Sequence, residues 1–156
     1  VQHQLESLNN MEKRIQSDLV AAMKEKNIIK LASIRAIKTA ITVAKTAPGA
    51  GEITDQDIIK IIQKLVKQRK ESAQQYNDAG RFDLAASELA EAEIMEVYLP
   101  KQLSEIELEV ELAKIIVEVG ATKPQDMGKV MGVATKRLAG LADGKAISTM
   151  VKKLLN

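Results

Sequence analysis

The stretch YLPKQLSEIE, residues 98–107, contains a helix stop followed closely by a helix start. Pro100 has no backbone N–H, so a helix that reaches it ends there. Ser104 and Glu107 have the spacing of a capping box, in which the two side chains accept hydrogen bonds from each other's backbone N–H groups. This stretch therefore predicts a boundary between two helical lobes.

Helical periodicity continues on both sides of this boundary. Apolar residues recur every three or four positions, and no segment alternates convincingly with a period of two. The expected helices span about 5–26, 28–46, 54–77, 83–99, 104–120, 124–139 and 145–155. The sequence thus predicts an all-α protein with an N-terminal lobe at 11–99 and a small C-terminal lobe at 100–156. Residues 1–10 are an extension of unknown status.

Several residues have the character of helix ends. Thr54 with Asp57 resembles a second capping box, and Asp83 is the expected cap of the fourth helix. Gly120 and Gly144 are expected at or beside helix ends, where glycine is common.

Composition limits the class of protein. Of the 156 residues, 46% are hydrophobic but only 2% are aromatic, which favours helix packing over a β-sandwich. The chain has no cysteine, which excludes disulfides, thiolate metal sites and a cysteine nucleophile. No apolar run is long enough to span a membrane, and no signal peptide is visible. We expect a soluble, cytoplasmic protein.

Basic residues are concentrated near the C-terminus. The net charge is only +2, but residues 127–156 contain six basic side chains and one acidic side chain, Asp143. A local basic surface suggests an anionic partner, although a solvated helix face is the commoner explanation of a single charge run.

The segment MGKVMGV, residues 127–133, places Gly128 and Gly132 within a helix, although each internal glycine costs about 1 kcal/mol relative to alanine. At 100° per residue, the glycines border the apolar stripe, and Lys129 and Lys136 stand beside them. A neighbouring helix could pack closely there, or a phosphate backbone could approach between the lysines. Both explanations can hold together. On the last helix, a pair of lysines, Lys145 and Lys152, points away from the apolar side.

Four segments carry a family resemblance: IKLASIRAIKTAI at 29–41, KQRKESAQQYNDAGRFDLA at 67–85, EVYLPKQLS at 96–104 and DMGKVMG...LADGK at 126–145. Together they resemble the GatB/YqeY family in its free-standing YqeY form. The resemblance implies an all-helical fold whose C-terminal lobe is similar to the tail domain of the GatB subunit of tRNA-dependent amidotransferase, a domain understood to hold tRNA.

The resemblance also implies site residues and partners. The tRNA-binding positions that match the motif are Gly128, Lys129, Gly132, Lys136, Gly144 and Lys145. Lys152 joins them from its place on the last helix. Leu141 departs from the family pattern, because relatives often place a basic residue there. An aminoacyl-tRNA synthetase or an amidotransferase subunit is a further expected partner, and no DNA or membrane is expected.

The family label, carbon–nitrogen ligase with glutamine as amido donor, is not matched by residues of a catalytic site. The chain has one histidine, His3, no phosphate-cradling loop after a strand and no Ser-Lys pair of amidase type. We expect no independent catalysis, no catalytic residues, no cofactor and no metal. Arg69 lies in an apolar stripe, where we expect it to pair with Glu88 or Glu91.

The near absence of aromatic side chains makes base stacking improbable, so an RNA partner would be recognised by shape, phosphate and ribose. The alternative function is a protein-interaction module. It would dock a helix of an aminoacylation or amidotransferase enzyme on the helix surface at Gly128 and Gly132, called here the glycine strip. RNA binding should fall steeply with salt, whereas helix docking should not.

Overall fold

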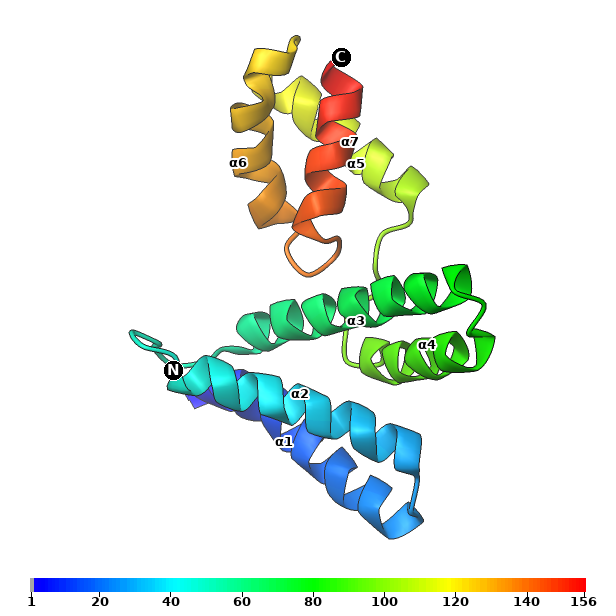
Figure 1. Ribbon diagram of the computed structural model, residues 1–156. Helices are drawn as coiled ribbons and strands as arrows, with labels where there is room; N and C mark the ends of the chain where they lie inside the picture. Colours follow the sequence, from blue (N-terminus) through cyan, green and yellow to red (C-terminus); the bar gives the residue numbers. More distant parts are fainter. Residues whose placement is uncertain (1) are drawn as a thin grey trace. The chain divides into compact units, whose positions relative to one another are not determined.

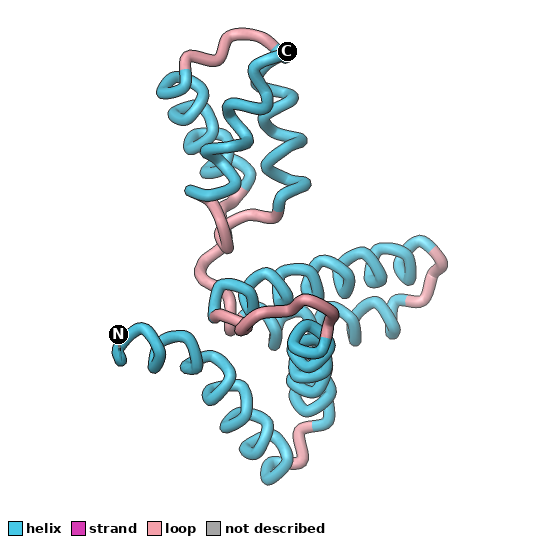
Figure 2. Tube along the Cα trace, turned by 90° about the vertical axis from the view of Figure 1, so that its left-hand side faces the viewer, coloured by secondary structure: helices cyan, strands magenta, loops and turns pink. Residues whose placement is uncertain are grey.

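The computed structural model describes the backbone of residues 2–156 and the side chains of residues 10–156 (Figure 1). Over this range all regular structure is helical, with seven α-helices, one short 3-10 helix and no strand (Figure 2). The all-α prediction is confirmed. None of the described helices is long and apolar enough to cross a membrane. The side chain of His3 lies outside the described residues.

The chain divides into two compact units, Val1–Leu99 and Pro100–Asn156, called here the N-terminal and C-terminal units. The N-terminal unit contains α1 (Gln2–Glu25), α2 (Ile28–Thr46), α3 (Asp55–Asp78) and α4 (Phe82–Glu96). The helices α1 and α2 lie side by side as a hairpin, and α3 and α4 form a second pair that packs against α2 (Figure 1).

The core of the N-terminal unit is built largely from isoleucine. The apolar positions predicted on successive helices meet there, and the largest of these buried side chains are Ile15, Ile34, Ile37, Ile58, Ile62 and Met95. Tyr98 closes this core: its hydroxyl donates a hydrogen bond to Asp18, and the Arg14 guanidinium lies 4.8 Å from its ring centre. Burial and the neighbouring Asp18 carboxylate raise the pKa of Tyr98, which keeps the hydroxyl protonated.

The helix starts follow the capping chemistry of the sequence, with one correction. Thr54 and Asp57 form the expected capping box on α3. Asp83 is not the cap of α4, because the helix begins at Phe82 and Arg81 occupies the N-cap position without a side-chain bond. Asp83 instead lies in the first turn, where a carboxylate interacts favourably with the positive end of the helix.

The C-terminal unit contains α5 (Glu105–Val119), the 3-10 helix η1 (Pro124–Asp126), α6 (Met127–Arg137) and α7 (Gly144–Leu155). The three α-helices pack on one another around a core of Leu, Ile, Val and Met. The capping box of Ser104 and Glu107 starts α5, as predicted. Gly120 ends this helix with a left-handed φ of 68°, which a residue with a Cβ adopts only at a cost.

The connection before α5 is hydrogen-bonded to the turn between α6 and α7. The Leu103 N–H donates to the Leu141 carbonyl at 2.9 Å, and the Gln102 amide donates to the Gly140 carbonyl at 2.8 Å. Residues before the first helical turn therefore belong to the fold of the C-terminal unit. Leu141, the position that departs from the family pattern, contributes its backbone to this contact.

Candidate nucleic-acid interface

The glycine strip lies on the solvent side of α6. The opposite side of the helix packs into the core, where Val130 and Ala134 are fully buried. Gly128, Gly132, Lys129 and Lys136 are all exposed. Four of the predicted site residues are thus brought together along one helix, with bare backbone bordered by two cations.

Among the described residues of the C-terminal unit, no neighbouring helix packs against this strip. Apart from the adjacent residues and the backbone of α6 itself, a Cβ added at Gly128 or at Gly132 would find no described heavy atom within 4 Å. Close packing by a helix of the same unit, one of the two explanations offered by the sequence, is therefore wrong for these glycines. The backbone of α6 is open here to something outside the C-terminal unit.

The lysines of the candidate interface are not used for salt bridges. Within residues 10–156, none of Lys129, Lys136, Lys145 and Lys152 has a carboxylate within ion-pair distance. The backbone N–H of Thr122 and, to a smaller extent, the charge of Lys129 lower the pKa of Asp126. Arg137 differs, because its guanidinium binds Glu118 of α5 at 2.8 Å.

The remaining predicted site residues lie at the start and along the solvent side of α7. Gly144 is the first residue of this helix, as expected, and Lys145 and Lys152 are exposed two turns apart. The Asp143 carboxylate accepts hydrogen bonds from the backbone N–H groups of Lys145 and Ala146. A protein carboxylate therefore already covers the helix start that would otherwise attract an anion.

Sequence reasoning missed Thr135, which is exposed near Gly128 and Gly132 on the same side of α6. Its hydroxyl donates to the Met131 carbonyl at 2.7 Å, and its free lone pairs can still accept a hydrogen bond. Helical geometry at 100° per residue would have found it, because position 135 falls beside position 128 on the helix surface.

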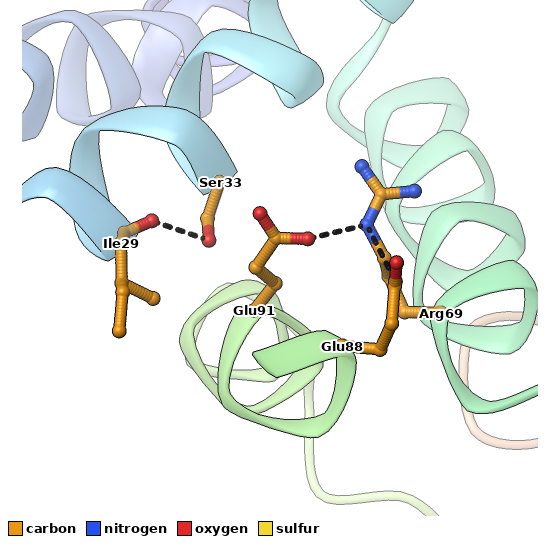
Figure 3. A network of polar contacts seen from close by, with 5 residues as sticks. All are labelled: Ile29, Ser33, Arg69, Glu88 and Glu91. Carbon is orange, nitrogen blue, oxygen red and sulfur yellow. Dashed lines mark hydrogen bonds and ion pairs between the residues drawn. The ribbon is translucent and has the colours of Figure 1, made fainter. Parts of the chain in front are cut away.

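A second polar site, in the N-terminal unit, is a salt-bridge cluster (Figure 3). Arg69 Nε lies 3.0 Å from a carboxylate oxygen of Glu91 and 3.6 Å from one of Glu88, as the sequence predicted. All three side chains are about three-quarters buried. Glu96, on the same helix α4, binds Lys70 at 2.7 Å. These three carboxylates of α4 thus pair with cations of α3.

A groove lies between α1 and α2 in the N-terminal unit. Three lysines line it, but Lys45 binds Glu12 at 2.7 Å and Lys38 binds Gln16. The Glu12 carboxylate therefore neutralises one of the three positive charges in the groove. The exposed lysines of α6 and α7 make a stronger candidate for an anionic ligand.

Comparison with known proteins gives a family and several relatives. The family described as Yqey-like protein matches residues 12–155. A relative from Pyrenophora tritici-repentis, named altered inheritance of mitochondria protein 41, mitochondrial, is 31% identical over 91% of this chain and 79% of its own length. The protein of the same name from Clavispora lusitaniae is 30% identical over 78% of this chain and 69% of its own length. The one from Lachancea thermotolerans is 26% identical over 97% of this chain and 80% of its own length.

The expected cytoplasmic location is wrong by this comparison, because these three relatives are named as mitochondrial proteins. The prediction rested on the missing cysteines, apolar span and secretory signal. None of these features separates the cytoplasm from the mitochondrion, whose proteins are addressed by a transit peptide of different composition.

Proposed function

The chain belongs to the Yqey-like protein family, and on that premise we propose that its C-terminal unit binds tRNA through the glycine strip of α6 and the lysines beside it and on α7. The relatives' names support a mitochondrial location for this activity. The resemblance of the segment 126–145 to the GatB tail domain supports tRNA as the ligand.

The observation that carries the proposal is the open backbone beside unpaired cations. Gly128 and Gly132 have no described neighbour within 4 Å of a Cβ position, and Lys129 and Lys136 make no ion pair with described residues. A phosphate group can approach such a backbone closely while the lysines neutralise its charge. Binding of tRNA would then explain why the helix keeps two glycines despite their cost in helix stability.

The same unit favours folded RNA over single strands. Residues 100–156 contain no aromatic residue, so unpaired bases have no ring on which to stack. Phosphate and ribose contacts along a helical stem remain available. We therefore expect binding to tolerate changes of base sequence while depending on folded tRNA.

Independent catalysis is not part of the proposal. We expect the purified chain to release no ammonia from glutamine and to amidate no glutamyl-tRNA without added subunits. An aminoacyl-tRNA synthetase or an amidotransferase subunit would supply the chemistry while this chain contributes RNA contacts. Robust turnover by the isolated chain, abolished by a single substitution within it, would contradict this expectation.

The test is tRNA binding by a Lys129→Glu/Lys136→Glu variant at several salt concentrations. Both side chains are exposed, so the far-ultraviolet circular dichroism should not change. If both lysines contact phosphates, the dependence of log K on log salt should become shallower by about two units, and affinity should fall at least tenfold at low salt.

A matched control reverses Lys13 and Lys64, which are also exposed, on helices of the N-terminal unit. This control has the same net charge as the test variant, so a general repulsion of RNA would affect both equally. Wild-type affinity of the Lys129→Glu/Lys136→Glu variant at low salt, with an intact fold, would refute the proposal and favour a partner helix on the glycine strip.

A further inference from the structure

Helix α5 has a second apolar side that faces solvent. Ile106, Val110 and Val117 are 75%, 48% and 80% exposed, and Ala113 between them is also exposed. Their spacing of four, three and four residues places them in one stripe, about 16 Å long at 1.5 Å per residue. The core-facing residues of α5, Leu108, Leu112 and Ile115, lie on the opposite side.

The fold of the C-terminal unit gives no reason for this stripe. Isoleucine and valine are poorer helix formers than alanine or glutamate, so an exposed helix side gains nothing from them. None of the three belongs to the core cluster of the unit. Single exposed apolar residues are ordinary on protein surfaces, but a row of them along three helical turns is typical of a contact surface.

The charges around the stripe indicate which partner fits it. Helix α5 contains five glutamates and one lysine. Glu105 and Glu109 border one side of the stripe. Beyond the other side, Lys114 is paired with Glu111 at 3.3 Å and Glu118 with Arg137 at 2.8 Å, so these charges are balanced within the unit. The acidic border formed by Glu105 and Glu109 repels RNA and anionic lipid, and it attracts a partner with basic residues.

We propose that this stripe docks an amphipathic helix of a partner protein whose apolar side is bordered by lysine or arginine. The apolar anchors at positions 106, 110, 113 and 117 match the spacing with which one helix recognises another, and the acidic border sets its orientation and selects basic partners. This surface is separate from the proposed RNA contacts on α6 and α7, so the C-terminal unit can hold both ligands at once.

The test uses the full chain and a synthetic 18-residue helix with leucines at positions i, i+3, i+4 and i+7 and lysines beside them. Binding is measured by fluorescence anisotropy and located by amide chemical shifts. We expect the shifts to change along Glu105–Glu118, and a scrambled peptide of the same composition to bind at least tenfold more weakly.

The decisive variant is Ile106→Asp/Val117→Asp, which adds two negative charges to the stripe. Purely electrostatic attraction to a basic peptide would become stronger, whereas apolar docking should weaken by about tenfold. The matched control is Val43→Asp, on α2, where the valine is 64% exposed. It should leave peptide affinity unchanged.

Three results would overturn the proposal: unchanged or tighter peptide binding by the double variant, shifts outside α5, or equal weakening by the control. A concentration-dependent dimer of the parent chain that the double variant abolishes would instead assign the stripe to a second copy. Transfer-RNA binding by the double variant is measured alongside. It should persist, so failure of the docking proposal and failure of RNA binding can be told apart.

Discussion

Replacing Gly132 by alanine should stabilise the protein, because the structure offers space and a helical backbone at this position. Gly132 lies in the interior of α6, no described atom is within 4 Å of its Cβ position, and its φ is not in the left-handed region. Alanine therefore brings no clash. It removes the conformational freedom that glycine gives the unfolded chain.

The expected gain is about 1 kcal/mol, the difference between glycine and alanine inside a helix. For a unit of this size that corresponds to a rise in melting temperature of about 4–8 °C. Gly120→Ala is the matched control, and it should lower the melting temperature instead of raising it. Gly120 also has empty space around it, but its φ of 68° is unfavourable for alanine and should cost about 1 kcal/mol.

The assay is differential scanning calorimetry of the whole chain, with hydrogen exchange of α6 peptides to assign the transition to the C-terminal unit. Gly132→Leu extends the series: it should fold normally because the strip is open, yet weaken tRNA binding by filling the approach to the backbone. A lower melting temperature for Gly132→Ala, or loss of folding for Gly132→Leu, would refute the reasoning and show that something in the chain packs against the strip.

Three further variants test the N-terminal unit and the helix caps. Arg69→Ala should lower the urea midpoint by the equivalent of about 1–3 kcal/mol, because it leaves two partly buried glutamates unpaired; a normal midpoint would contradict this. Tyr98→Phe should cost about 1 kcal/mol by the same measurement, through the lost hydrogen bond to Asp18. Hydrogen bonds from backbone N–H groups lower the pKa values of Asp57 and Glu107 in the folded protein. The two carboxylates therefore stabilise the fold fully at a pH above their pKa in the unfolded chain, and this contribution is lost as the pH falls through their pKa in the folded protein. Asp57→Asn/Glu107→Gln should therefore lose less stability than the parent on acidification from about pH 5 to about pH 3; equal losses in urea titrations would exclude this role.

Much of the fold could be predicted because local chemistry decides it. The capping boxes at Thr54 and Ser104 and the glycine stop at Gly120 depend on residues within one helical turn, and all three are confirmed. Asp83 was misplaced because a first-turn carboxylate and an N-cap carboxylate have the same sequence signature. Gly140, with a φ of 81°, was missed because turn conformation depends on the packing of flanking helices.

The candidate site was only partly predictable. Helical geometry placed Gly128 and Gly132 at the border of the apolar stripe of α6 with the lysines beside them, and the structure has all four residues exposed. Sequence could not say whether another helix covers that side, because this depends on how three helices meet. The apolar stripe of α5 was missed for a related reason: residues such as Val110 look like core residues until the true core side, through Leu112, is known.

The hydrogen bonds of Gln102 and Leu103 determine how the molecule can be dissected. A truncation placed at the start of α5 would remove both donors, leave the carbonyls of Gly140 and Leu141 without them, and take away the serine that caps the helix. A truncation placed at Pro100 would keep all of these groups. Any transplant of this module onto another protein should therefore begin at the proline, with the five residues ahead of the helix carried along as part of the graft.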